Sequence, residues 1–237
     1  MHANRARHPW KSLAIASFVF VLAFGAFVSI APPASAATIY KYGPTAPGEI
    51  WFSGDTYVLI GHVTVPFGRS LTIQPGAIVK MDPLRALYVE GRLSADGLPG
   101  NLILVQANNT LSLFPYIGIQ FNATSGGSVS WSSFERPWSA VIATDSNPAI
   151  HNNTVRNADR GFHLMRSGSV VADNSVNRGN WGIWADQSDA LIVRNAINGT
   201  FHGEEIPPCM TQIFHHSKKG RMRPFAPFKI PTKRHIS

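Results

Sequence analysis

The chain has 237 residues, only 14% of them charged, and a formal net charge of +8. That charge comes from the two ends, because residues 37–200 contain 11 basic and 11 acidic residues. A body without net charge argues against a nucleic-acid-binding core, so we expect no nucleic-acid partner.

The first segment has the pattern of an export signal. Arg5, Arg7 and Lys11 precede an uncharged apolar run over 13–30, and the small residues 34–36 (Ala-Ser-Ala) follow it. This order predicts a secretory signal over 1–36 that is cleaved after Ala36. The alternative is an uncleaved membrane anchor, since about 18 apolar residues can just cross a bilayer. Both interpretations place the body outside the cytoplasm, in the cell envelope or the extracellular space.

The next residues predict β-structure. Residues 37–56 are expected to form a lead-in or cap, and 57–203 a series of short strands. Alternating apolar residues are separated there by Gly, Pro, Asn and Asp, and no apolar stripe of helical period occurs. The pairs Leu71/Leu93 and Ile78/Ile103 indicate rungs of 22–25 residues in this first part. The single cysteine, Cys209, excludes an internal disulfide.

A strict repeat of 21 residues follows. Residues 150–155, 171–176 and 192–197 align, each with an apolar residue, an Asn three positions later and a second apolar residue two positions after that. The repeated columns are Asn153, Asn174 and Asn195, and Gly161, Gly182 and Gly203. A fixed short period is the signature of a solenoid. Its length suits a coil of three short strands, stacked into three parallel sheets around an apolar interior.

The alternation of side chains assigns the faces of these strands. Phe162 and Leu164 are expected to point inward, and His163 outward; one rung later Ile183 points inward and Trp184 outward. The Asn column is expected at a sharp bend, because Asn tolerates left-handed backbone angles. Stacked Asn side chains can also pass amide hydrogen bonds from rung to rung.

These columns carry a resemblance to a known family. The run Ile150-x-x-Asn153-x-Val155, followed by Gly161-Phe162 and then repeated, resembles the right-handed parallel β-helix repeats of the pectin-lyase-like superfamily. The nearest branch contains nitrous-oxide-reductase accessory-type proteins and surface proteins. The resemblance covers about 50–203 and implies an all-β, right-handed, three-sheet solenoid. It is more specific for the fold than for an activity.

The repeat fails after Gly203, where Glu204 and Glu205 take the next two positions. We expect a basic, disordered tail over 204–237, or the truncated or frame-shifted end of a longer solenoid. A basic tail that binds the cell envelope is a further alternative.

Catalytic residues are poorly indicated. Lyases and glycosidases of this fold need converging acidic residues, whereas the acids of this chain are scattered over turns and strand ends. We therefore expect no catalytic site. The candidate group for a polysaccharide lyase or hydrolase is Asp186, Asp189 and Arg166.

The outward aromatic residues indicate a binding role instead. His163 and Trp184 occupy one outward column, and Trp181 lies at the turn just before Trp184. Such a surface suits stacking against sugar rings, although a loop or a second copy could cover it. Histidines fall at different positions of different rungs, so we expect no metal site and no cofactor; Ca²⁺ or Cu would have no evident ligand set. The sequence thus predicts an exported, non-catalytic module that binds carbohydrate or envelope components, with a lyase or glycoside hydrolase as the alternative.

Overall fold

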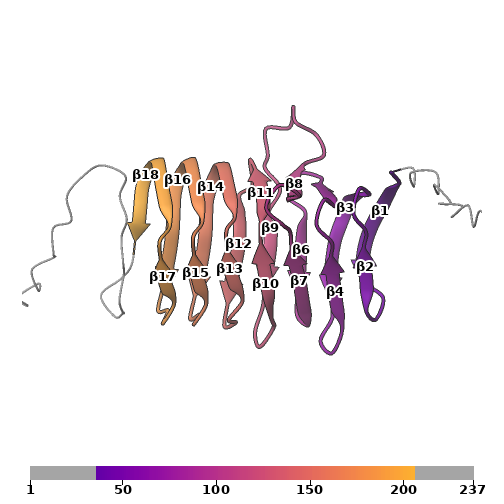
Figure 1. The fold of residues 1–237 in the computed structure, drawn as a ribbon, viewed down its shortest axis with the longest axis horizontal. Coiled ribbons are helices and arrows are strands. Elements are labelled where there is room, and N and C mark those ends of the chain that lie inside the picture. Colours follow the sequence, from indigo (N-terminus) through magenta and orange to yellow (C-terminus); the bar gives the residue numbers. More distant parts are fainter. Residues whose placement is uncertain (1–35, 206–237) are drawn as a thin grey trace, which may run out of the picture. The chain divides into compact units, whose positions relative to one another are not determined.

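The computed structural model describes residues 36–205, and the side chains only of residues 36–200. This part of the chain is a parallel β-helix, in which successive coils lie side by side from indigo to yellow in Figure 1. Every pairing between its strands is parallel. The predicted all-β solenoid is confirmed. Within residues 36–205 we find no helix with the length and apolar character needed to span a bilayer.

Each coil has three faces. The first face is a seven-stranded sheet of β2 (Glu49–Trp51), β4 (Ser70–Ile73), β7 (Arg92–Asp96), β10 (Gly126–Ser130), β13 (Ala149–His151), β15 (Val170–Ala172) and β17 (Leu191–Val193). The second face contains β5 (Ile78–Met81), β8 (Ile103–Ala107) and β11 (Ser132–Glu135). The third face contains β6 (Ala86–Val89), β9 (Gly118–Phe121) and β12 (Ser139–Thr144).

The second and third faces belong to one sheet, because the longer strands run around the corner between them. These strands are β1 (Thr38–Pro44), β3 (Thr56–Val65), β14 (Thr154–Met165), β16 (Ser175–Asp186) and β18 (Ala196–Glu205). In β3, for example, the first half pairs with β5 and the second half with β6. The expected three sheets are therefore three faces formed by two sheets.

The apolar core follows the predicted alternation. Phe162, Leu164 and Ile183 are fully buried inside the coil, and Ile150 and Val171 stack beneath one another on the first face. The strict rungs are 21 residues long, as Val129 pairs with Ile150 and Ile150 with Val171. The predicted inward positions of the repeat are thus confirmed.

The earlier rungs are less regular than predicted. Leu71 pairs with Leu93, which gives the expected spacing of 22 residues, but the Ile78/Ile103 alignment is wrong by one position. Ile78 pairs with Leu104, because Ile103 points into the core and Leu104 is exposed. The rung between Leu93 and Gly127 is 34 residues long. It contains a loop over 108–117 that projects beside β8 in Figure 1.

The Asn column forms a buried amide ladder. Asn174 Nδ2 donates to Asn195 Oδ1 (3.0 Å) and to the carbonyl of Ile150 (3.0 Å). Asn174 Oδ1 accepts from the backbone N–H of Asn153 (2.9 Å) and from Asn153 Nδ2 (3.0 Å). Each Asn side chain therefore satisfies backbone groups in neighbouring rungs as well as the next amide.

The left-handed conformation at this corner belongs to the residue before each Asn, contrary to our expectation. Asn152 and Asp173 have φ of 57° and Arg194 has φ of 52°. The other two corners repeat the pattern at Asp145, Arg166 and Gln187, and at Arg136, Asn157, Arg178 and Gly199. Each coil is thus bent by single left-handed residues, and the Asn beside one of them supplies hydrogen bonds.

The Gly column marks a close approach of two coils. Gly161 lies in β14, Gly182 in β16 and Gly203 in β18. A Cβ on Gly161 would lie 2.2 Å from the carbonyl oxygen of Gly182 and 2.9 Å from a Val176 methyl group. A side chain at this position would force the two coils apart.

Gly161→Ala is therefore expected to lower the free energy of unfolding by about 1–3 kcal/mol through overpacking. Urea unfolding followed by circular dichroism measures the change. Gly126→Ala is the matched control, because its Cβ would meet no atom within 4 Å. An equal loss in both variants would contradict the close approach at Gly161.

β18 continues to Glu205, and its residues Glu204 and Glu205 pair with Ile183 and Trp184. The predicted end of the solenoid after Gly203 thus falls two residues before the end of this strand. The tail beyond 205, which includes Cys209, lies outside the described residues, as does the predicted signal up to Ser35.

Candidate functional site

Outward side chains on the third face form one cluster, which we call the aromatic–arginine patch. It consists of Trp138, Arg160, His163, Trp181 and Trp184. Arg160 pairs with Trp181, and His163 with Trp184, so the register of β14 and β16 places each couple side by side on adjacent rungs. Trp138 precedes β12, on the rung before. The patch therefore crosses three successive rungs.

The rings of the patch are stacked. His163 and Trp184 have ring centroids 4.7 Å apart with an interplanar angle of 16°. Trp181 and Trp184 are 5.4 Å apart at 24°. Arg160 Cζ lies 4.8 Å from the Trp138 ring centroid and 4.4 Å from that of Trp184. The guanidinium thus joins two indoles by cation–π contacts, each contributing about 0.5–1 kcal/mol.

The predicted exposure of His163 is only partly realised. Its side chain points away from the coil interior, yet the residue is 8% exposed because Trp184 stacks on it. Burial, followed by the nearby positive charge of Arg160, lowers the pKa of His163 to about 4, while Asp186 acts in the opposite direction. His163 is therefore neutral at neutral pH and supports the Trp184 ring.

Arg160 has incomplete hydrogen bonding within the patch. Its Nη1 lies 3.4 Å from His163 Nδ1, and its Nε lies 3.8 Å from an Asp159 carboxylate oxygen. That Nε is buried and has no hydrogen-bond partner within the described residues. The patch thus combines apolar ring surface with a cation whose donors are not all used.

The sequence prediction found Trp181, Trp184 and His163 but missed Trp138 and Arg160. The 21-residue spacing from Arg160 to Trp181 could have identified Arg160. Trp138 is out of this register, because Ser139 is the residue that pairs with Arg160.

The long loop over 108–117 begins next to the patch. The backbone N–H of Trp138 donates to the carbonyl of Tyr116 (2.7 Å), and Arg136 Nη1 donates to the carbonyl of Thr110 (2.6 Å). Leu111 and Leu113 on this loop are about nine-tenths exposed. The sequence gave no periodic signal for this loop, which adds an apolar surface near Trp138.

The predicted catalytic group does not form a reactive site. Arg166 Nε and Nη2 donate to the two carboxylate oxygens of Asp145, each at 2.6 Å. The hydrogen bonds from Asp145 raise the pKa of Arg166, whereas a general base needs a lowered one. Asp186 accepts the backbone N–H of Arg166 through its carbonyl, and Asp189 is exposed.

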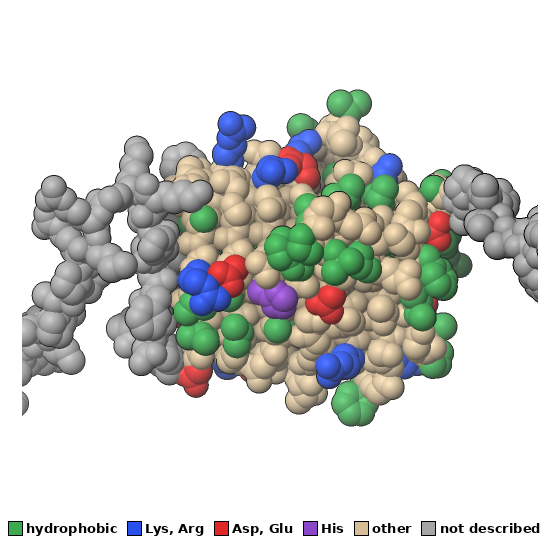
Figure 2. All heavy atoms as spheres, viewed as in Figure 1, with side chains coloured by type: hydrophobic (Ala, Val, Ile, Leu, Met, Phe, Trp, Pro, Cys, Tyr) green, Lys and Arg blue, Asp and Glu red, His purple; other side chains and the backbone are tan. Residues whose placement is uncertain are grey.

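The corner residues also form external ion pairs. Arg194 Nε and Nη2 donate to the two carboxylate oxygens of Asp173, each at 2.6 Å, one corner away from the Asp145–Arg166 pair. On the face of the molecule drawn in Figure 2, charged side chains are few and scattered, without a continuous basic field. That distribution agrees with the neutral body predicted from the sequence.

The repeat region resembles one known family. Residues 98–203, under half of the chain, match the sequence model of NosD, described as a periplasmic copper-binding protein. The resemblance predicted from the Asn and Gly columns is confirmed. No curated protein and no solved structure gave a significant match. The periplasmic description of NosD supports an exported protein of the cell envelope.

The copper in the description of NosD requires a set of converging ligands. Within the described residues, no group of three His, Cys, Asp or Glu side chains is placed to hold a metal ion. His163, the histidine of the patch, has its ring stacked on Trp184 and its Nδ1 beside the cationic Arg160. The NosD-like repeats of residues 36–200 thus do not fit a copper site.

Proposed function

We propose that this protein is an exported, non-catalytic β-helix module that binds carbohydrate through the aromatic–arginine patch. The observation that carries the proposal is the continuous surface of Trp138, Trp181 and Trp184 around Arg160 across three rungs. The axial C–H faces of sugar rings pack on aromatic rings, and a guanidinium donates hydrogen bonds to sugar oxygens.

The flat third face suits an extended ligand. Neighbouring β-strands lie about 4.8 Å apart, so three rungs span a length comparable to a short oligosaccharide. The stacked pairs hold the indole rings in fixed orientations, which reduces the entropy lost on binding. The periplasmic description of NosD supports a ligand in the cell envelope.

The non-catalytic part of the proposal is supported by Arg166. Its bidentate pairing with Asp145 occupies the guanidinium that the alternative enzyme would use as a base. Incubation with pectin and alginate tests this point. Product formation that Asp186→Asn abolishes would establish the lyase or hydrolase alternative instead.

Trp184→Ala is expected to weaken glycan binding about tenfold or more. The change removes a ring that contacts His163, Trp181 and Arg160, and with it the centre of the patch. A glycan array followed by calorimetry on the bound sugar measures the effect.

Phe67→Ala is the matched control for this experiment, because Phe67 is 81% exposed and is not a member of the patch. We expect it to leave glycan binding unchanged. Binding that survives Trp184→Ala at full strength would refute the patch as the binding surface.

A further inference from the structure

The solenoid begins at the bond that the export signal predicts to be cut. β1 starts at Thr38, and the two residues before it, Ala36 and Ala37, are exposed. The Ala36–Ala37 peptide bond is therefore accessible at the first coil. The sequence places the Ala34-Ser35-Ala36 pattern of a processing peptidase directly before this bond.

Ala37 already has partners for both of its backbone groups. Its nitrogen donates to Asp55 Oδ1 at 2.8 Å, and its carbonyl accepts from the backbone N–H of Thr56 at 2.7 Å. A carboxylate thus faces the atom that would become the new amino terminus.

Asp55 is held in place by the backbone around it. Its carbonyl accepts from the N–H of Ile78 in the next coil (2.9 Å), and its N–H donates to the carbonyl of Phe52 (3.3 Å). The residue is half-buried in the turn between β2 and β3. Its carboxylate is therefore directed at β1 by a backbone that the next coil fixes.

We propose that export processing after Ala36 creates an α-ammonium group on Ala37 that forms an ion pair with Asp55. A peptidase adds water across the Ala36–Ala37 amide: the hydroxyl goes to the carbonyl carbon of Ala36, the C–N bond breaks, and the Ala37 nitrogen takes up protons to become the ammonium. The existing N–H···O bond at 2.8 Å thus becomes a charge-assisted one.

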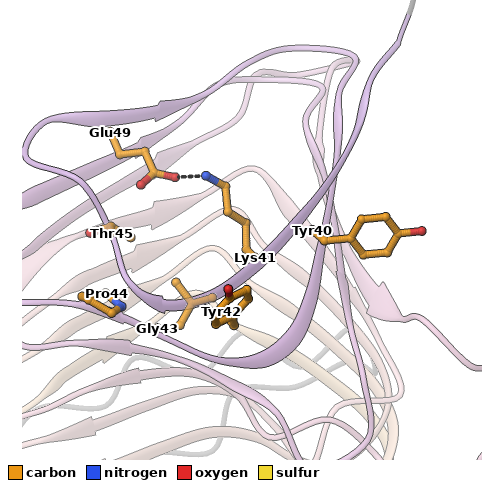
Figure 3. Close-up of a pocket in the computed structure, with 8 residues that line it drawn as sticks. Tyr40, Lys41, Tyr42, Gly43, Pro44, Thr45 and Glu49 are labelled. Atoms are coloured by element: carbon orange, nitrogen blue, oxygen red, sulfur yellow. Dashed lines mark ion pairs between the residues drawn. The ribbon is translucent and has the colours of Figure 1, made fainter.

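This ion pair has a structural purpose, because β1 is an edge strand. Within the described residues β1 pairs with β3 alone. Solenoids need their terminal coils fastened, since each coil contacts only its neighbours. Figure 3 shows Lys41, further along β1, reaching Glu49 at 2.6 Å. The Ala37–Asp55 pair would fasten the beginning of the strand in the same way, and only after processing.

The first test is the mass of the protein secreted by an exporting bacterial host from the full-length gene. The proposal requires a chain that begins at Ala37. A mass that corresponds to a different first residue, or to the uncleaved chain, overturns it.

The second test measures the ion pair by a double-mutant comparison. Asp55→Asn is introduced into the secreted protein and into a form that retains Ala36 behind an initiator methionine, in which the Ala37 nitrogen remains an amide. The substitution is expected to lower the folding equilibrium constant about two- to fivefold more in the secreted form.

Asp189→Asn is the matched control, because it removes the same charge from an exposed residue. It is expected to act equally in the two forms. An equal effect of Asp55→Asn in both forms would overturn the ion pair even if the mass shows cleavage after Ala36.

Discussion

Asn174→Ala is expected to lower the free energy of unfolding by about 3–5 kcal/mol. The side chain makes four hydrogen bonds in the core and is 2% exposed. Its removal leaves the N–H of Asn153 and the carbonyl of Ile150 without these partners, and each buried group left unpaired costs about 1–3 kcal/mol. Urea unfolding followed by tryptophan fluorescence measures the loss.

Asn180→Ala is the control for the ladder. Asn180 is exposed and donates a single hydrogen bond, to Asp159. A surface change of this kind is expected to stay within about 0.5 kcal/mol. If the two alanine variants unfold at the same urea concentration, the ladder does not stabilise the corner.

The stability of the protein is expected to fall as the pH drops from 6.5 toward 4. The pKa of His163 is about 4 in the folded protein against an ordinary value of 6.5, so the unfolded chain takes up a proton that the folded chain does not. This contribution is fully present above pH 6.5 and declines below it, by about 1.4 kcal/mol per pH unit and about 3 kcal/mol in all.

His163→Phe removes this titration while it keeps a ring against Trp184. The variant is expected to show a flat stability between pH 6.5 and 5, a range above the titration of ordinary carboxylates. Urea unfolding at half-unit steps of pH compares the two proteins. A wild-type curve that is flat over the same range would show that His163 is not buried as the structure has it.

Much of the fold is predictable because the strict rungs repeat both parity and spacing. Phe162 and Ile183 could be placed inside the coil, and Trp184 outside it, from alternation alone. The earlier rungs resist this reasoning, since a rung of 34 residues interrupts the spacing between Leu93 and Gly127. The one-residue error at Ile103 has the same origin, because only the pairing in space fixes which residue faces the core.

The candidate site was predictable only in part. The sequence places Trp184 and His163 in one column, but it does not show that Arg160 lies across two indole rings. That contact depends on side-chain rotamers and on Trp138, which is out of register with the column. The pairing of Arg166 with Asp145 also joins residues 21 positions apart. Such a pair was visible in the spacing once the corner was known, but not before.

The left-handed corners have a consequence for how this protein can change. Chemically unlike residues, such as Asp145, Arg166 and Gln187, share one backbone conformation in one column. The stacked coils impose that conformation, at a cost of about 1–2 kcal/mol for each residue other than glycine. Selection can therefore exchange these outward side chains while the interior stays the same. The solenoid separates the part of its sequence that must be inherited unchanged from a lattice of corner positions on which new surfaces can evolve.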